Sequence, residues 1–436
     1  MASYRDREAY IPYQRSELIE LCLEEGYFNR EEAKKFQEFC SLLSAFYHFK
    51  FQTYLEKLKD SYAPFNPDTK LLSNKITEAD LPKIEAELVE NFQLVLERAN
   101  YKPISQAALK DTFKNSSVIK LKTEVDFGDF DQMICYRRGD FEQTIEVKKL
   151  FKKQKQQIKV LDRVVLLIKF KNESYFRDRN KNKGLLKFTP GKMYVYFYRN
   201  VPVFDLELLF PNIKISMTWK DRLKLIIPAL GAAIPVVLRA LPKLALLLGA
   251  ISFLVFGSTK IFGFEISEEQ VRNFMPVLTA LLSLIVVLGS YAFKQYSKYK
   301  SKQIEFRKKV TDTLFFKNQA NNASVFYSLI DAAEEEECKE IILVYYHLLT
   351  SKTPLTASEL DDRIETWMDE KFQVKIDFDI RGPINNLKQI RGRFKADNSA
   401  EIALLKQDKS GNCHILPLEE SKLLIDYIWD NIFHYT

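Results

Sequence analysis

Apolar residues recur at helical spacing through the first 116 residues of the chain. Asn29 and Glu32 stand three apart, as in a capping box, and from Phe36 onward apolar side chains follow at intervals of three, four and their multiples. A shorter helix capped by Ser16 is expected before this one. Aromatic stripes at this spacing are typical of core packing, so residues 1–116 predict a helical region. The shorter helices are predicted at 16–25, 81–99 and 105–114.

From Ile119 the pattern changes to alternation. Ile119, Leu121 and Val125 are separated by charged or polar residues, which is typical of a strand with one buried face. We therefore expect residues 117–222 to form a mostly antiparallel β region. Its strands are predicted at 119–125, 132–136, 157–170, 193–198 and 213–217.

The last part of the chain, 300–436, returns to helical periodicity. An acidic-started helix is predicted first, Thr356 and Glu359 match a capping box for the second, and the third holds Pro383 in its first turn. Three helices, a hairpin and a closing helix predict a winged-helix-like domain. These elements are expected at 334–349, 356–367, 379–390, 401–406 with 412–416, and 419–433.

Between these regions lies a strongly apolar segment, 223–299. Residues 274–293 carry no charge, and at ~1.5 Å rise per residue such a helix crosses the ~30 Å hydrocarbon core of a bilayer. A second span is predicted at 244–262. The proline-containing segment 223–243 is expected to lie in the interface or to kink the first helix, with re-entry into the membrane as the alternative. The expected fold class is α+β, with a two-helix transmembrane hairpin between the soluble regions.

Charges around this hairpin predict its orientation. Lys and Arg crowd both outer flanks, whereas the short connection around Gly263 holds mainly acidic residues. By the positive-inside rule both soluble regions face the cytoplasm, matrix or stroma. We expect the cytoplasmic or thylakoid membrane in a bacterium and an organelle membrane in a eukaryote. The two predicted spans hold no Asp, Glu or His, which disfavours a channel or pump.

Composition agrees with a small membrane module on a water-exposed protein. Of the 436 residues, 46% are hydrophobic and 28% charged, and the mean hydropathy of −0.22 is too low for a transporter with many spans. The opening residues lack the apolar stretch of a secretory signal. The five cysteines are scattered without a C-x-x-C pair, so we expect neither disulfides nor a zinc site.

Basic residues are densest in 148–192. Such a stretch could bind RNA, contact anionic headgroups at about 1 kcal/mol per basic residue, or form an inert solvated face. Because the hairpin would already hold the domain at a membrane, lipid contact is preferred to nucleic acid. The candidate lipid-contacting residues are Lys148, Lys149, Lys152, Lys153 and Lys155.

Another charged cluster directly precedes the membrane segment. Asp205 and Glu207 lie two apart between two prolines, which in an extended chain places both carboxylates on one face. An ion-paired structural corner is favoured over a metal or ligand site at the membrane surface. The residues close enough in sequence to pair with the two carboxylates are Arg199, Asn200, Asp221 and Arg222.

The same cluster carries a family resemblance. Residues 198–211 (YRNVPVFDLELLFP), with 214–217 (KISM) and 221–223 (DRL), resemble a family of uncharacterised two-span membrane proteins of cyanobacteria, plastids and mitochondria. This family includes an animal mitochondrial transmembrane protein. The resemblance implies membrane localisation and no particular activity. Segments similar to that family also occur at 10–15 (YIPYQR), 136–139 (YRRG) and 160–164 (VLDRV).

Motifs for catalysis are missing from the sequence. The four histidines form no H-E-x-x-H, and there is no P-loop, G-x-S-x-G or G-x-G-x-x-G, so no catalytic residue, cofactor or metal is expected. The favoured function is a membrane scaffold or adaptor. The alternative is an enzyme that acts on a lipid or membrane-bound substrate at the Arg199 to Glu207 corner.

A partner is expected at the C-terminal domain. Its third predicted helix could present Arg381, Lys388 and Arg391 to nucleic acid, but residues 301–436 are net acidic, which weakens attraction to phosphates. We therefore favour a protein partner there over nucleic acid.

Overall fold

The computed structural model describes residues 9–69, 76–115, 122–149, 152–179, 186, 188–216, 260–261, 264–265, scattered positions between 282 and 311, 314–393 and 401–432. The chain divides into two compact units. The first comprises Met1–Thr112, Phe127–Leu206 and Lys317–Thr436, and the second comprises Phe113–Asp126 and Glu207–Phe316. Helices and antiparallel sheets make this a mixed α+β fold, as the sequence predicts.

Four helices open the first unit: α1 (Arg15–Glu24), α2 (Arg30–Tyr62), α3 (Leu81–Arg98) and α4 (Gln106–Asn115). Asn29 caps α2 in the predicted capping box, accepting from the amides of Glu31 and Glu32 at 2.9 Å. Ser105 accepts from the third residue beyond it, Ala108, at 3.1 Å. The cap of α1 is Gln14 rather than Ser16, because Glu17 reaches back to the Gln14 amide.

The predicted aromatic stripe of α2 lies mostly in the core. Phe36, Phe39 and Leu43 are fully buried, as are Tyr47 and Phe51. A single hydrophobic core joins these side chains to residues of α3, the sheet and the C-terminal helices. The stripe therefore binds the parts of the first unit to one another.

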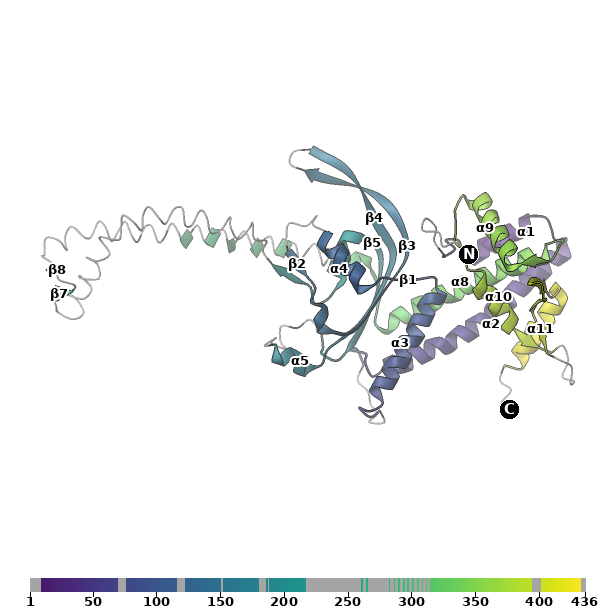
Figure 1. The fold of residues 1–436 in the computed structure, drawn as a ribbon, viewed down its shortest axis with the longest axis horizontal. Helices are drawn as coiled ribbons and strands as arrows, with labels where there is room; N and C mark the ends of the chain where they lie inside the picture. Colours follow the sequence, from purple (N-terminus) through teal and green to yellow (C-terminus); the bar gives the residue numbers. More distant parts are fainter. Residues whose placement is uncertain are drawn as a thin grey trace. The chain divides into compact units, whose positions relative to one another are not determined.

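One five-stranded antiparallel sheet completes this core, in the order β1-β3-β4-β5-β9 (Figure 1). Strand β4 is a continuous apolar run from Val164 to Ile168 because both of its faces are covered; all five side chains are at most 1% exposed. The strands are β1 (Lys102–Pro103), β3 (Phe130–Lys149), β4 (Lys152–Phe170), β5 (Met193–Pro202) and β9 (Asn318–Asn321), with short helices η1 (Phe127–Asp129), α5 (Glu173–Asp178) and η3 (Val203–Leu209) between them.

Strands β3 and β4 are much longer than predicted. β5 pairs with β4 only between Val160 and Lys169, whereas β3 and β4 continue to pair as far as Lys149 and Lys152. Beyond the sheet they form a two-stranded ribbon, the arm drawn at the top of Figure 1. We call residues 141–149 and 152–160 the β3–β4 ribbon.

Helix α8 (Ala323–Leu349) runs through the centre of the first unit. It packs against α1, α2, α3, β5 and β9 as well as against the C-terminal elements (Figure 1). The sequence places the start of this helix at Glu334, but it begins eleven residues earlier. The four glutamates from Glu334 to Glu337 consequently lie in the middle of a packed helix, not at its dipole-favoured first turn.

The C-terminal elements follow α8 in the predicted order. Thr356 caps α9 in the expected capping box, and a three-stranded antiparallel sheet of order β10-β14-β13 lies beside the helices. Helix α11 returns to pack on α2. The elements are β10 (Leu355–Thr356), α9 (Ala357–Phe372), α10 (Arg381–Gln389), β11 (Arg391–Gly392), β12 (Ile402–Ala403), β13 (Leu405–Gln407), β14 (Asn412–Ile415) and α11 (Leu418–Asp430).

In the second unit, β2 (Lys122–Glu124) pairs with β6 (Lys214–Ser216), and β7 (Lys260–Ile261) pairs with β8 (Phe264–Glu265). The segment 223–243 lies outside the described residues, as do nearly all positions of the predicted spans 244–262 and 274–293. Within the part of the chain that is described, no helix combines the length and apolar character needed to cross a membrane.

Candidate functional site

The predicted corner is held by ion pairs with other parts of the chain. Arg199 on β5 pairs with Asp162 on β4 at 3.9 Å, and Asp205 pairs with Lys317 at 3.7 Å. Asn200 is exposed in a left-handed conformation with φ of 53°. The remaining three candidates are placed differently: Glu207 is buried in the second unit, and Asp221 and Arg222 lie outside the described residues.

The Asp205–Lys317 pair is largely shielded from water. The two side chains are 17% and 19% exposed. Burial lowers the pKa of Lys317, and the carboxylate of Asp205 opposes that shift. The pair links η3 to Lys317, the residue before β9. The chain leaves the first unit after Leu206 and returns to it at Lys317, so the pair joins the two ends of this excursion.

The candidate lipid-contacting lysines lie at the end of the β3–β4 ribbon. In the strand register Lys148 lies opposite Lys153, and Lys149 lies opposite Lys152. Lys155, which is exposed, lies opposite Glu146. Strand pairing thus gathers four of the five lysines at one end of a projecting ribbon.

A cavity of about 550 Å³ collects three of the segments that carry the family resemblance. Residues from 10–15, 136–139 and 160–164 meet there with residues of α8, although they are far apart in the chain. We call it the Tyr10 pocket. Its lining includes Tyr10, Tyr101, Arg138, Asp162, Glu336 and Lys339.

A buried ion pair on α8 fastens the N-terminal segment to this pocket. Lys339 and Glu336 are 3% and 2% exposed, and the ammonium of Lys339 donates to the carboxylate of Glu336 at 2.6 Å. Lys339 also donates to the carbonyls of Ile11 at 2.6 Å and Tyr13 at 3.2 Å, while the Ile11 amide donates to Glu336 at 3.0 Å. Both charged side chains therefore hydrogen-bond to the backbone of the same N-terminal segment, at Ile11 and Tyr13.

Arg138 lies between two tyrosine rings at the wall of the pocket. Its guanidinium carbon is 5.2 Å from the ring centre of Tyr10 and 5.0 Å from that of Tyr101, within cation–π range. It donates to the carbonyl of Ala99 at 3.2 Å and lies 3.9 Å from Glu336. This arrangement orders the segment around Tyr10 from a second side.

Gly139 makes this packing sterically possible. Its φ is +68°, and a Cβ there would lie 3.1 Å from the Tyr10 hydroxyl and 3.2 Å from the Asp162 Cβ. A glycine in the Tyr-Arg-Arg-Gly segment is thus required both by the left-handed backbone and by the close approach of Tyr10.

Two polar atoms of the pocket have no hydrogen-bond partner: the hydroxyl of Tyr101, a side chain only 4% exposed, and Nε of Arg138. Burial raises the pKa of Tyr101, and the nearby guanidinium of Arg138 opposes this. The hydroxyl consequently stays protonated. These two atoms can hydrogen-bond to a ligand.

Deeper carboxylates of α8 lie behind the pocket. Burial raises the pKa of Glu337 even though Arg98 lies 3.3 Å away, and it raises the pKa of Glu340 well above its usual range. Asn100 donates to Glu340 at 2.8 Å and to the carbonyl of Ala9 at 3.2 Å. These acids link the N-terminal segment to the helix core.

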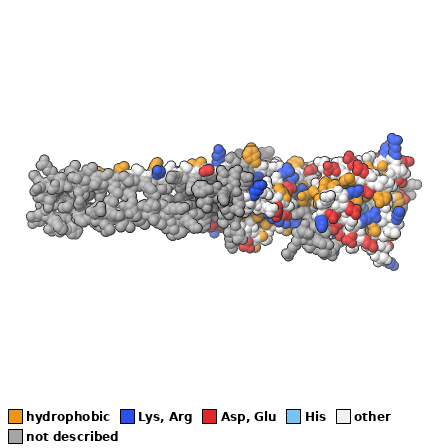
Figure 2. Space-filling view, turned by 90° about the horizontal axis from the view of Figure 1, so that it is seen from above, with side chains coloured by type: hydrophobic (Ala, Val, Ile, Leu, Met, Phe, Trp, Pro, Cys, Tyr) orange, Lys and Arg blue, Asp and Glu red, His pale blue; other side chains and the backbone are white. Residues whose placement is uncertain are grey.

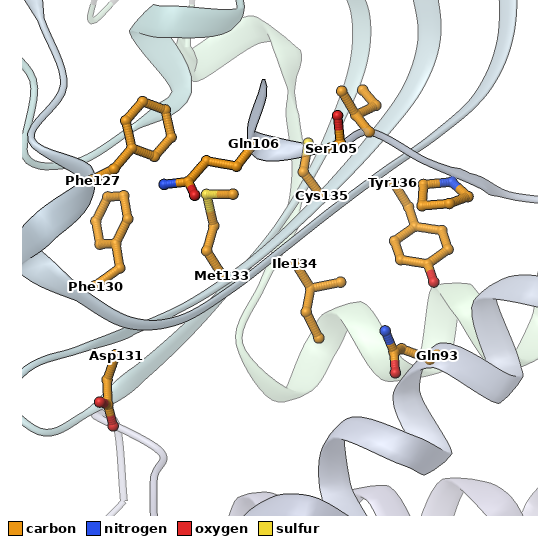
Figure 3. Close-up of a pocket in the computed structure, with 12 residues that line it drawn as sticks. Gln93, Ser105, Gln106, Phe127, Phe130, Asp131, Met133, Ile134, Cys135 and Tyr136 are labelled. Atoms are coloured by element: carbon orange, nitrogen blue, oxygen red, sulfur yellow. The ribbon is translucent and has the colours of Figure 1, made fainter. Parts of the chain in front are cut away.

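A smaller cavity of about 400 Å³ lies along β3 (Figure 3). Met133 and Cys135 lie with Gln106 and Phe127 on one side of the strand, and Ile134 and Tyr136 lie toward Gln93 on the other, as the two-residue period of a strand requires. Burial raises the pKa of Cys135 to about 12, so its thiol is a poor nucleophile.

No metal centre is formed by the described residues. Among them no group of three or more His, Cys, Asp or Glu side chains could hold a metal ion. His48 lies 3.0 Å from Glu334, His414 lies 3.2 Å from Asp408, and His347 accepts from Arg363 at 3.3 Å. These histidines are dispersed over three places, as their sequence spacing suggests.

Sequence reasoning missed Glu336, Lys339, Arg138 and Tyr101 as members of one site. The resemblance segments contained Arg138, and the run of glutamates contained Glu336, but each was interpreted locally. The contacts that join them link residues up to 328 positions apart. The signal that could have indicated this site is that the family resemblance lies in several separate segments of the chain.

Part of the chain matches a known family. Residues 161–324 match the family model described as "Protein of unknown function (DUF3754)". This range begins in β4 and ends at the start of α8. It includes the Arg199 and Asp205 ion pairs and the whole apolar segment 223–299. No solved structure matches the chain. The match supports a domain of unknown function over these residues.

Proposed function

We propose that the chain is a two-span membrane-anchored scaffold or adaptor, related to the uncharacterised two-span proteins of cyanobacteria, plastids and mitochondria. Its spans are 244–262 and 274–293, and both termini lie on the positive-inside face. The apolar runs and the basic flanks support this arrangement. The family match covers the same segment.

The observation that carries the scaffold role is the engagement of charged side chains at both candidate sites. Asp205 pairs with Lys317, Arg199 with Asp162, and Glu336 with Lys339. An enzyme of the alternative kind needs an acid or base that opens on a substrate cleft. The carboxylate of Asp205 is instead held by the ammonium of Lys317 at 3.7 Å.

The β3–β4 ribbon is proposed to contact anionic headgroups. Its register brings Lys148, Lys149, Lys152 and Lys153 together at one end, where each is worth about 1 kcal/mol near an anionic surface. The residues between the two strands in the sequence are Leu150 and Phe151. A basic ribbon around two apolar residues suits a membrane surface better than nucleic acid.

The C-terminal part is proposed to be a winged-helix-like module for a protein partner. Helices α8, α9 and α10 with the β10-β14-β13 sheet support this assignment. On the face of the first unit drawn in Figure 2, acidic and basic side chains are interspersed over the described residues. This mixture favours a protein surface over a phosphate backbone.

Two experiments test the proposal on the full chain. Cysteine labelling from either side of sealed vesicles should place Cys substitutions near both termini on one face and a substitution at Gly263 on the other. Crosslinking in the membrane followed by purification in mild detergent should recover a protein partner that depends on the C-terminal part. Opposite faces for the termini would refute the topology, and turnover of a lipid substrate would favour the enzyme.

Ribbon contact is tested by replacing Lys148, Lys149, Lys152 and Lys153 with Gln. In vesicles with anionic lipid, hydrogen exchange of the ribbon amides should become faster than in the unmodified protein. The matched control replaces four exposed lysines elsewhere: Lys34, Lys352, Lys406 and Lys409. Equal exchange in both variants would exclude a lipid role for the ribbon.

A further inference from the structure

A cavity of about 660 Å³ lies away from the sites described above, where α8 and α9 meet the residues that follow α1. None of its lining residues belongs to the Tyr10 pocket or to the Asp205 corner. Its principal lining residues are Tyr27, Tyr346, His347, Asp362, Trp367 and Glu370.

Two residues that line this cavity each hold a buried polar atom for which the described residues provide no hydrogen-bond partner. They are the hydroxyl of Tyr346 and Nε2 of His347, and the two residues are 1% and 2% exposed. A buried polar atom left unpaired destabilises a fold by roughly 1–3 kcal/mol, and such atoms are rare in native proteins. Two of them at one cavity point to a ligand that supplies the missing hydrogen bonds.

The protonation of His347 follows from its other nitrogen. Arg363 donates from Nε to Nδ1 of His347 at 3.3 Å, and Arg363 also donates to Thr350 at 3.5 Å. Burial, with a further contribution from Arg363, lowers the pKa of His347 to about 3. The imidazole is therefore neutral, Nε2 carries the hydrogen, and the unpaired atom is a donor that needs an acceptor such as a carbonyl.

Aromatic rings form a connected wall. Tyr27 meets Tyr346 edge to face at 6.5 Å between ring centres, Tyr346 meets His347 at 5.1 Å, and His347 meets Trp367 at 5.5 Å. Trp367 donates to Glu25 at 3.3 Å, which fixes its indole. Indole and phenol faces attract cations, and a guanidinium stacks on them better than an ammonium does.

Carboxylates on one face of α9 supply the charge. Asp362 and Glu370 are eight residues apart and exposed, and neither forms an ion pair within the described part of the chain. Glu25 and Glu359 also line the cavity, but Glu25 pairs with Lys371 and Glu359 caps α9. One cation, Arg363, also lines the cavity, and its guanidinium donates to His347 and Thr350. The negative charge available to a ligand is therefore that of Asp362 and Glu370, partly offset by Arg363.

We propose that this cavity binds an arginine residue of a partner's peptide segment, with its guanidinium at Asp362, Glu370 and Trp367 and its backbone carbonyl accepting from Nε2 of His347. The hydroxyl of Tyr346 makes the second polar contact. This inference names the partner chemistry of the adaptor role proposed above, and it rests on that role for its biological meaning.

The probe is N-acetyl-arginine amide, titrated into the full chain in detergent micelles by calorimetry or ligand-observed NMR. A Kd on the order of 1 mM is expected for so small a ligand. N-acetyl-citrulline amide has the same shape without the charge and should bind at least tenfold more weakly. n-Butylguanidine, which keeps the single positive charge of the guanidinium but lacks the backbone carbonyls, should also bind more weakly.

The double variant Asp362→Asn with Glu370→Gln should weaken binding of the arginine probe about tenfold. The matched control, Asp369→Asn with Glu420→Gln, removes two exposed charges that do not line the cavity and should leave the Kd unchanged. Tyr346→Phe should weaken binding without lowering the melting temperature, because the hydroxyl it removes has no partner in the free protein.

Three results would overturn the inference: no binding up to about 10 mM, citrulline binding as tightly as arginine, or equal losses in the cavity variant and its control. n-Butylguanidine binding as tightly as the peptide probe would overturn the peptide assignment. Loss of the captured protein partner with intact probe binding would count against the adaptor role alone, so the two failures are distinguishable.

Discussion

At the scale of single residues, Lys339 is a charged side chain that is almost completely buried. Its ammonium is 3% exposed and is shared by one carboxylate and two backbone carbonyls. Removing one partner of a buried pair leaves the other charge without compensation, which costs more than the pair contributes net. The Lys339–Glu336 contact therefore matters to stability chiefly because its loss leaves a buried charge uncompensated.

Lys339→Met is expected to lower the free energy of unfolding by about 3–5 kcal/mol, because Glu336 stays buried without its cation. Urea unfolding followed by circular dichroism measures the change. Lys34→Met is the control: this side chain is 77% exposed, and its change should stay within about 0.5 kcal/mol. Similar losses in the two variants would contradict a stabilising role for the buried Lys339–Glu336 ion pair.

The carboxyl group of Asp361 predicts the direction in which the protein's stability changes with pH. Burial, followed by the neighbouring carboxylates of Glu365, Asp362, Asp377 and Asp379, raises its pKa to about 7. The folded protein therefore holds this proton more tightly than the unfolded chain does. Its stabilising contribution is present below about pH 4 and is lost as the pH rises to about 7.

Asp361→Asn should make the protein more stable than the unmodified chain above pH 7, by an amount on the order of 1 kcal/mol after solvent screening. The advantage should shrink as the pH falls toward 5, where Asp361 is itself protonated. Melting temperatures across pH 5–8 measure it. Asp369→Asn, an exposed acid on the same helix, should give an offset that does not change with pH. A constant offset for Asp361→Asn would refute the assignment.

At the scale of elements, local signals were predictable and long-range pairing was not. The capping boxes of Asn29 and Thr356 lie within four residues, so the sequence displays them directly. The start of α8 was misjudged because a run of glutamates resembles a first turn, and only its burial against Ile11 and Arg98 accounts for a position in mid-helix. The length of β3 was missed although Phe141, Ile145 and Val147 alternate with polar residues in its outer half, so this part of the signal was present in the sequence and overlooked.

The candidate sites follow the same rule. The corner was recognisable as charged, but the partners of Arg199 and Asp205 are Asp162 on β4 and Lys317 just before β9, which are distant in the sequence. The Tyr10 pocket needed three segments and α8 together. A sequence shows which residues have unusual chemistry, whereas the fold decides which of them meet.

Gly139, which lies within β3 in a left-handed backbone conformation, yields a prediction for this strand. Gly139→Ala should cost about 2–4 kcal/mol, since it combines left-handed strain with a Cβ 3.1 Å from the Tyr10 hydroxyl. Gly411→Ala is the matched control: its φ is +86°, but nothing lies within 4 Å, so only the strain of about 1–2 kcal/mol applies. Chemical unfolding compares the two. Equal losses would mean that contact with Tyr10 is unimportant.

At the scale of the whole molecule, the first unit is assembled from three stretches of chain. The second unit leaves it after Leu206 and returns at Lys317. The two ends are close together, since Asp205 pairs with Lys317 at 3.7 Å and Tyr198 lies opposite Asn318 in the sheet. The insertion therefore occupies a connection that a short loop could bridge.

Replacing residues 207–316 with a Gly/Ser linker of about six residues should leave a folded body, because such a linker spans roughly 13 Å. The variant should stay in solution without detergent and melt cooperatively by circular dichroism. A chain truncated after Phe316 is the control and should not fold, because it lacks α8 and its core side chains. A non-cooperative melt of the linked variant would show that the insertion is needed for the body's stability.

The position of α8 late in the chain also bears on how the protein is made. The contacts that complete the N-terminal helices, such as Glu336 with Ile11, join residues 325 positions apart. A ribosome adding ~5–20 residues per second needs on the order of ten seconds to proceed from the end of β5 to the end of α8. During that interval the apolar surfaces of α2 and of the sheet that pack on α8 are uncovered, while the hydrophobic insertion is already emerging. Nascent chains should therefore depend on a holding chaperone until α8 is released, and slowing translation within 217–316 should lengthen that dependence.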